Sequence, residues 1–308
     1  MPSVRDLRDR IRSLKNTQQI TKAMKQVAAA KIRRAEAAQK RARPYADALP
    51  EMLADLIAAV SSVDHPFMRP GKAAAGPGVI LMSADKGLAG AFNSNVIRAG
   101  DEFAREHGGA RYYTIGIKAR NAVRRIGHGE DPTWSLGSGA KLDTAREVAA
   151  RSTADFQKGE ISQIVLVSQK LVSTMVQRPQ TRTLVPIQNS LPASDRRERS
   201  PERGVAESKG VAESKGAAES KGAMEFAPSP EFVLSRLLPK YLEFTIFSAM
   251  LETDAAFFAA QLVAMTNATD NASKLVDELT IAMNNARQAA ITKELLEIVG
   301  GAEALGVE

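Results

Sequence analysis

One segment decides the fold of this chain: residues 251–290, LETDAAFFAAQLVAMTNATDNASKLVDELTIAMNNARQAA. Small or apolar side chains recur through it at alternating steps of four and three residues, and Thr269 is the one polar member of this stripe. A stripe with an average spacing of 3.5 residues keeps facing a partner helix as the two helices supercoil. Its members are Leu251, Ala255, Phe258, Leu262, Met265, Thr269, Ala272, Val276, Leu279, Met283, Ala286 and Ala290. We therefore expect a long helix that packs closely against a second one. Beyond Ala290 the apolar register slips to Ile291, Leu295 and Ile298.

The N-terminal residues supply a matching stripe for the second helix. Its members are Val4, Leu7, Ile11, Leu14, Ala28, Ile32, Ala35, Ala42, Ala46, Leu49, Leu53, Leu56 and Val60. At 1.5 Å per residue, a continuous helix over residues 3–58 would span roughly 80 Å, so part of it should protrude from a compact domain. Pro44 and Pro50 predict a kink or an interruption.

The N-terminal stripe is itself interrupted between Leu14 and Ala28. Gln18, Thr21 and Lys25 occupy its positions there, while Ile20, Met24 and Val27 present a rotated face. We interpret this stretch as a place where the helix contacts another molecule. A simple stutter in the heptad pattern is the alternative.

Charge is unevenly distributed in this chain of net charge +7. Residues 1–45 hold 13 Lys and Arg against 3 Asp and Glu, whereas residues 250–308 hold 3 against 9. A basic arm that binds nucleic acid is one interpretation. However, the first aromatic residue is Tyr45, so the arm cannot stack on bases. We favour a basic face that complements the acidic C-terminal segment, and we expect no nucleic-acid partner.

The middle of the chain predicts an α/β domain. Strand-like runs alternate with amphipathic helical runs, which indicates a mainly parallel sheet. The expected strands cover 78–83, 111–117 and 161–167, and the expected helices cover 91–107 and 142–157. An antiparallel hairpin is then expected from 171–176 and 181–187, with its turn at 177–180.

Composition places the boundaries of the segments. Residues 189–225 contain three copies of a charged hexapeptide, VAESKG, VAESKG and AAESKG, at 205–222. Such repeats cannot bury a core and predict a flexible insertion. Ser229-Pro230-Glu231 is a typical helix start, and Pro239 predicts a bend two turns later. The expected division is 1–60 for the first long helix, 76–188 for the α/β domain, 189–225 for the insertion and 229–305 for the second long helix.

The sequence offers little catalytic chemistry. With no cysteine there is no disulfide, zinc thiolate or thiol nucleophile. His65, His107 and His128 lack metal-ligand spacing. Glu294 and Glu297 lie one helical turn apart, but such pairs are usually a solvated helix face. The longest mostly apolar run, 53–63, is too short to span a bilayer.

The stretch DKGLAGAFNSN at 85–95 follows an expected strand and opens an expected helix. Backbone N–H groups at such a place attract phosphates. Only Gly87 and Gly90 are placed for a cradle, and neither common phosphate-loop spacing is present. We therefore favour a tight strand-to-helix turn, and we expect no catalytic residue, no cofactor and no metal site in this chain.

Four segments resemble the gamma subunit of the F-type ATP synthase. They are ITKAMKQVAAAK at 20–31, SADKGLAGAFNSN at 83–95, NATDNA at 267–272 and ITKELLEIVGGA at 291–302. The resemblance covers nearly the whole chain except about residues 189–225. It implies a long antiparallel two-helix coiled coil, formed by the terminal helices, and a central Rossmann-like α/β domain that binds no nucleotide.

The resemblance also implies a mechanical function. In that family the coiled coil stands inside a hexamer of three alpha and three beta subunits, one copy per hexamer. The α/β domain holds the epsilon subunit and the membrane ring of c-subunits. The shaft couples proton-driven rotation of the ring to ATP synthesis or hydrolysis on the beta subunits and performs no chemistry itself. The expected location is the cytoplasmic face of the bacterial inner membrane, with membrane association only through the complex.

Some family contacts carry over to this chain by position. Arg287, Gln288 and Thr292 match polar contacts to a beta subunit, with Met24 and Lys25 on the N-terminal helix as further contacts. Phe226 and Ala227 match the side that faces the c-ring. The chain departs from the family at 256–261, where AFFAAQ replaces a Ser-Glu-His-Ala-Ala-Arg pattern, and at Ala227, where the family has Glu.

Two other classes of function remain open from the sequence. The chain could be a coiled-coil scaffold that associates with itself, which predicts homo-oligomers. It could also be a nucleotide-dependent enzyme that uses the turn at Gly87 and Gly90, which predicts nucleotide binding by the isolated chain.

Overall fold

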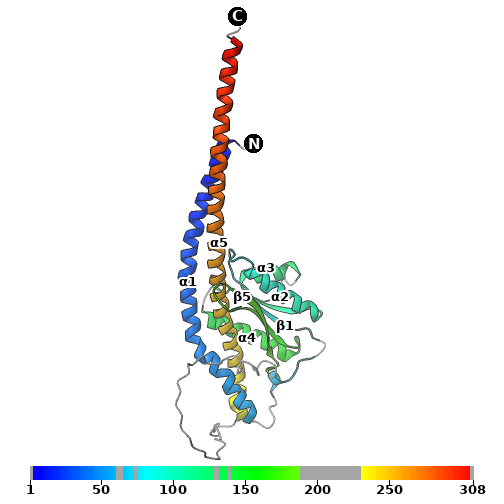
Figure 1. Cartoon of the computed structure of the whole chain (residues 1–308). Coiled ribbons are helices and arrows are strands. Elements are labelled where there is room, and N and C mark those ends of the chain that lie inside the picture. The colour runs from blue at the N-terminus through cyan, green and yellow to red at the C-terminus, as the bar shows by residue number, and fades with distance from the viewer. Residues whose placement is uncertain are drawn as a thin grey trace, which may run out of the picture.

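The computed structural model describes residues 3–59, 65–72, 75–127, 132–137, 140–187 and 230–305. The elements in chain order are α1 (Val4–Ala59), η1 (Pro66–Met68), β1 (Gly78–Met82), α2 (Phe92–Glu106), β2 (Arg111–Ile115), α3 (Ile117–Arg125), β3 (Thr133–Trp134), α4 (Lys141–Lys158), β4 (Ile164–Leu171), β5 (Gln177–Val185) and α5 (Pro230–Leu305). Helices α1 and α5 lie side by side and run in opposite directions, with the α/β domain against α5 (Figure 1). The predicted mixture of long terminal helices and an α/β domain is therefore confirmed. The expected insertion at 189–225 lies outside the described residues.

The sheet has five strands in the order β3-β2-β1-β4-β5. Strands β3, β2, β1 and β4 are parallel, and β5 joins the edge antiparallel to β4. Every residue of β1 is buried because helices cover both faces of the sheet. Val79, Leu81 and Val165 pack beneath α2 and α3, while Ile80 and Leu166 face α4 and α5. The expected parallel-rich sheet is thus present.

The predicted hairpin is present, but its turn was placed wrongly. The turn lies at 172–176, where the N–H groups of Val172 and Ser173 both donate to the carbonyl of Val176, at 3.2 and 3.1 Å. Residues 177–180, expected to form the turn, begin β5, and Pro179 pairs with Gln169. Proline fits there because an edge strand has one side without ladder hydrogen bonds. The short elements α3 and β3 were not predicted.

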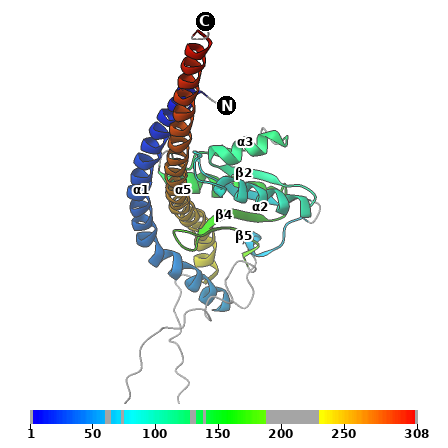
Figure 2. The same cartoon turned by 45° about the horizontal axis from the view of Figure 1, so that its top comes forward.

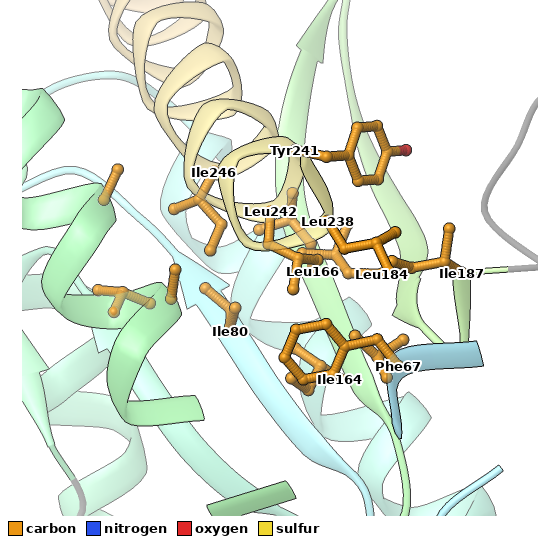
Figure 3. Close-up of a cluster of buried hydrophobic side chains, with 14 of the residues drawn as sticks. Phe67, Ile80, Ile164, Leu166, Leu184, Ile187, Leu238, Tyr241, Leu242 and Ile246 are labelled. Carbon is orange, nitrogen blue, oxygen red and sulfur yellow. The ribbon is translucent and has the colours of Figure 1, made fainter. Parts of the chain in front are cut away.

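The main core lies between the sheet, η1 and the first half of α5. Leu238, Leu242 and Ile246 project from α5 onto Ile80, Ile164 and Leu166 (Figure 3). Leu53 and Leu56 of α1 belong to the same cluster, and both are fully buried. One continuous core therefore joins α1, α5 and the sheet.

The prolines inside the long helices do not end them. Helix α1 continues through Pro44 and Pro50, and α5 continues through Pro239. Helix α1 changes direction in its lower part (Figure 2). The bend directs Leu49 and Leu53 into the core, and that burial outweighs the backbone hydrogen bonds lost at each proline. Of the two predicted alternatives, a kink or an interruption, α1 therefore shows the kink (Figure 2).

Above the core, α1 and α5 contact one another through small side chains. Ala28 of α1 and Ala255 of α5 are both fully buried, and Ala272 is nearly so. The single polar member of the α5 stripe, Thr269, donates a hydrogen bond from its hydroxyl to that of Thr21 at 2.9 Å. Thr21 is itself buried, so this part of the expected interruption in α1 faces the partner helix. Ile20 and Val27, by contrast, are exposed on the rotated face, as expected.

Helix α5 is also long and apolar enough, by length and composition alone, to cross a membrane within Phe232–Gly300. The sequence of α5 holds no uninterrupted apolar run that would indicate a membrane-spanning helix. Half of the window concerned is buried inside the protein, as in the core helix of a globular domain. The apolar character of α5 is thus explained by its contacts with α1 and the sheet.

A pair of substitutions in α1 tests whether its bent part belongs to the core. Leu53→Ala should lower the free energy of unfolding by about 2–5 kcal/mol, because Leu53 is completely buried. Met52→Ala removes a side chain that is half exposed and should change it by less than about 1 kcal/mol. Urea unfolding followed by circular dichroism measures both values. Equal effects would show that α1 beyond Pro50 does not pack as described.

Candidate functional site

The upper end of α5 is the first candidate surface. It extends past the beginning of α1 (Figure 1), and every residue from Arg287 to Gly300 is exposed. Arg287, Gln288 and Thr292 therefore all face solvent, and the Thr292 hydroxyl donates to the Gln288 carbonyl at 3.0 Å within the helix. Three of the five predicted contact residues thus share a projecting surface.

The same tip carries large apolar side chains. Ile291, Leu295, Leu296, Ile298 and Val299 are each at least half exposed. Glu297 pairs with Lys293 at 3.5 Å along the helix. Glu294 and Glu297 therefore lie on an ordinary solvated helix face. Exposed apolar surfaces of this kind are typical of protein-binding sites.

Met24 and Lys25 lie on a separate surface. Both are half-buried on α1, and Lys25 lines a groove between the helices with Leu262 and Thr269. Arg287 follows Thr269 by 18 residues, a distance of about 27 Å along the helix axis. The structure therefore does not bring Met24 and Lys25 together with the residues of the tip. Phe226 and Ala227 lie outside the described residues.

The turn that follows β1 is organised around Asp85. Its carboxylate accepts hydrogen bonds from the N–H of Ile117 at 3.0 Å, the Ser135 hydroxyl at 2.7 Å and the N–H of Gly137 at 2.8 Å. Ile117 is the first residue of α3, so the carboxylate occupies the position at this helix N-terminus that attracts anions. The phosphate hypothesis concerned a different helix N-terminus, that of α2, where Ala91 is the N-cap residue and no side chain caps the helix.

Burial and hydrogen bonding act in opposite directions on Asp85. Partial burial of the carboxylate raises its pKa, but the hydrogen bonds from Ser135, Gly137, Ile117 and Leu136 outweigh burial and lower the pKa below its ordinary value. Asp85 therefore stays ionised at neutral pH and holds three loops together.

Phe257 of α5 packs at the carboxyl ends of the strands, where it also lines a pocket of about 230 Å³ with Ala84 and Leu136. Open α/β sheets bind ligands where successive connections leave in opposite directions, which in this sheet is between β1 and β4. Here Phe257 packs against Phe92 with ring centroids 5.7 Å apart. Ala84, Ala89, Ala256 and Ala260 complete this buried cluster. The departure AFFAAQ at 256–261 thus forms a second contact between α5 and the α/β domain, beside the main core, a role that the sequence analysis did not identify.

Polar contacts reinforce the packing around Phe257. We define the joint as the buried cluster of Ala84, Ala89, Phe92, Ala256, Phe257 and Ala260 together with the polar pairs Lys141–Asp254 and Glu252–Leu171. Lys141 at the start of α4 pairs with Asp254 of α5 at 2.9 Å. Glu252 accepts a hydrogen bond from the N–H of Leu171 at 3.3 Å. Its burial raises its pKa, although the contact with Leu171 acts in the opposite direction. The joint therefore couples α5 to α4 and to the end of β4.

The described histidines have local structural contacts. The His65 ring accepts a hydrogen bond from the N–H of Phe67 at 3.2 Å, and the His107 ring stacks on Phe103. His128 lies outside the described residues. Among the residues that the structure describes, no group of three or more His, Asp or Glu side chains is placed to hold a metal ion.

Two antiparallel helices with a projecting tip, and an α/β domain packed against one of them, define a shaft-like protein (Figure 1). The family model described as ATP synthase matches residues 3–305. The ATP synthase gamma chain of Pelotomaculum thermopropionicum is 41% identical, and the match covers 99% of this chain and all of that one. The gamma chains of Phenylobacterium zucineum and Heliobacterium modesticaldum are 40% and 39% identical with the same coverage. The chain belongs to the ATP synthase gamma chain family, as the resemblance predicted.

Solved structures share the fold. A chain of the Euglena gracilis mitochondrial ATP synthase, described as OSCP/F1/c-ring in rotational state 3, gives a TM-score of 0.64 at 18% identity and covers 98% of this chain and 94% of that one. A chain from the central stalk and c-ring of the Tetrahymena thermophila mitochondrial enzyme gives 0.55 at 18% identity, over 81% of this chain and 99% of that one.

Replacing Asp85 tests its structural role. Asp85→Asn should lower the free energy of unfolding at pH 7 by about 1–3 kcal/mol, because hydrogen bonds to a charged acceptor are weakened. The exposed Glu102→Gln should have little effect. The pKa is lowered in the folded state, so the stabilisation is complete at neutral pH. It should shrink as the pH falls below about 3.9, the ordinary Asp value. A pH-independent difference in urea unfolding would contradict this assignment.

Replacing Phe257 tests the joint. Phe257→Ala should cost about 3–5 kcal/mol, because it leaves a cavity beneath α5. Leu275→Ala, at a half-exposed position of the same helix, is the matched control and should cost less than about 1 kcal/mol. Hydrogen exchange should also rise in 84–92 only for the Phe257 variant. Unchanged exchange there would argue against the contact.

Proposed function

We propose that this chain is the central rotor shaft of an F-type ATP synthase. In this role it couples proton-driven rotation of the c-ring to ATP synthesis or hydrolysis on an alpha–beta hexamer. The observation that carries the proposal is the full-length similarity to bacterial gamma chains. The projecting tip of α5 and its joint to the α/β domain give the chain a shape suited to the task.

The mechanism assigns different parts of the chain to different partners. The tip stands inside the hexamer, where Arg287, Gln288 and Thr292 contact a beta subunit in turn. The shaft changes the relative stability of otherwise equivalent subunit conformations, because each subunit meets a different side of it. Met24 and Lys25 form a second contact lower on the shaft. Torque passes from the α/β domain to α5 through the joint at Phe257.

The remaining partners follow from the same proposal. One copy of the chain serves each hexamer of three alpha and three beta subunits. The α/β domain contacts the epsilon subunit and the c-ring, with Phe226 and Ala227 on the ring side. The complex lies at the cytoplasmic face of the bacterial inner membrane. Catalysis belongs to the beta subunits, and this chain contributes contacts alone. Residues 1–60, 76–188, 189–225 and 229–305 are the proposed divisions.

Reconstitution tests this function directly. The purified chain should combine with alpha and beta subunits into an assembly of one copy per hexamer, with ATPase activity, as native mass spectrometry and a coupled assay can measure. Failure to form an active assembly would contradict the proposal. A self-associating scaffold is the second candidate, because the exposed Leu295, Leu296 and Ile298 favour helix association. It predicts concentration-dependent homo-oligomers instead of capture by the hexamer.

The contacts at the tip can be tested separately from folding. Arg287→Ala and Gln288→Ala should each lower the ATPase rate of the assembled complex by about two- to tenfold, the size expected for one exposed polar contact. Lys274→Ala removes an exposed side chain from the same helix below the tip and should leave the ATPase rate unchanged. All three variants should unfold at the wild-type temperature. Wild-type rates for both tip variants would remove these residues from the beta contact.

A further inference from the structure

One polar contact joins α1 and α5 inside a mainly apolar seam. The Thr269 hydroxyl donates to the Thr21 hydroxyl at 2.9 Å. Thr21 also reaches the carbonyl of Gln18 at 3.0 Å, and Thr269 reaches that of Met265 at 2.7 Å. Whichever hydroxyl donates across the seam, the other can donate to a carbonyl of its own helix, so the pair is satisfied although Thr21 is buried. Among the described residues, no other hydrogen bond or ion pair links side chains of α1 and α5.

Side-chain packing alone does not fix the two helices beside this pair. A groove of about 360 Å³ opens between α1 and α5 there, and Gln18, Lys25 and Leu262 line it together with Thr269. Side chains that border an open groove lack contacting atoms on one side, so they can shift without a clash. The hydrogen bond between the two threonines is therefore the contact that resists a shift of one helix along the other.

The buried residues that flank the pair are small or adaptable. Met265 and Ala272 flank Thr269 on α5, and Ala28 follows Thr21 on α1. Alanine is too short to interlock with a facing helix, and methionine adapts its shape to its neighbours. A hydrogen bond, in contrast, weakens steeply when its distance or angle departs from the optimum. A single polar residue in an apolar seam can accordingly specify the register of paired helices.

The pair lies next to a surface that we propose to contact a partner. Met24 and Lys25 follow Thr21 by three and four residues, so both are its neighbours one turn along α1. Both are half-buried, and Lys25 lines the same groove as Thr269. Any shift of α1 at Thr21 therefore moves these two side chains relative to α5.

We propose that the Thr21–Thr269 pair positions the shaft for its second beta contact. The hydrogen bond fixes α1 on α5 and so holds Met24 and Lys25 at the place where the partner meets them. This inference rests on the proposed rotor function. Thr21 and Thr269 are positioning residues, because they act through Met24 and Lys25 and touch no partner themselves.

The first test removes the hydroxyls from the full chain, which is then assembled with alpha and beta subunits. Thr21→Val/Thr269→Val keeps the shape of both side chains and removes the hydrogen bond. The ATPase rate should fall by about two- to tenfold, the factor that corresponds to one hydrogen bond. Each single variant should lose as much as the double variant, because either substitution breaks the same contact.

Two further variants serve as controls in the same assay. Thr269→Ser keeps the hydroxyl and should keep the wild-type ATPase rate. Thr280→Val is the matched control, because the Thr280 hydroxyl bonds within its own helix, to the Val276 carbonyl at 2.7 Å. Its rate should also equal that of wild type. All variants should unfold within about 3 °C of wild type, since valine gains apolar burial where threonine loses a bond.

A second measurement follows the helices themselves and needs no partner. The chain has no cysteine, so spin labels attach selectively at Lys15→Cys on α1 and Lys274→Cys on α5, which are both exposed positions. Electron paramagnetic resonance gives the distribution of distances between the two labels. This distribution should be broader when Thr21 and Thr269 are both replaced by valine, and it should keep its wild-type width in the Thr280→Val control.

The other outcomes are also decisive. A wild-type ATPase rate in the double variant, or an unchanged distribution of distances, would overturn the inference and leave the rotor function standing. Losses that add in the double variant would overturn it too, because the hydroxyls would then act separately. A rate loss with unfolding more than about 5 °C below wild type would reduce the pair to a stabilising contact. A wild-type chain that forms no active complex would overturn the rotor function, and the inference with it. If the double variant does not fold, the single variants carry the test.

Discussion

The packing of α5 against two partners at once is the constraint on which the structure depends. An isolated helix of this length gains little stability from its backbone alone, so its order comes from the surfaces that it buries. In the turns of α5 around residues 255–260, Ala255 and Ala259 are fully buried, whereas Phe257 packs against Phe92 of the α/β domain. Small residues allow a close helix pair, and Phe257 adds a second contact with the α/β domain to the main core around Leu238 and Leu242. Helix α5 therefore determines both the slim shaft and the position of the α/β domain.

Much of this architecture could be predicted from the sequence because periodicity reports burial. The stripe that begins at Leu251 and the fully apolar β1 give unambiguous patterns. The turn of the hairpin could not be placed, because proline usually indicates a turn and Pro179 instead lies in an edge strand. In the sequence Thr21 interrupts the apolar stripe of α1, and nothing in the sequence shows that it pairs with Thr269 of α5. Likewise Phe257 is off the heptad stripe, and its partner Phe92 lies 165 residues earlier in the chain. Contacts of that kind require the fold.

The buried core that stabilises the fold and the exposed surfaces proposed to contact partners lie in different parts of the protein. The core around Leu53, Ile164 and Leu242 lies at the lower end, where α1, α5 and the sheet meet. The exposed residues proposed to contact a partner lie elsewhere, on the tip of α5. A rotor needs such a division, because torque must pass through a firmly packed joint. The surfaces that slide or dock, in contrast, should interlock little. The exposed apolar side chains at the tip suit the second of these tasks.

Rotation of the shaft is the central claim, and direct observation tests it best. The chain has no cysteine, so Ser173→Cys, in the exposed hairpin turn of the α/β domain, offers a single attachment point for a gold particle. The assembled complex would be fixed to a surface through its beta subunits and supplied with ATP. The account predicts that the particle turns in one direction in three equal steps per revolution and stops when ATP is withdrawn. A particle that stays still, or moves at random while the same complexes hydrolyse ATP, would contradict it.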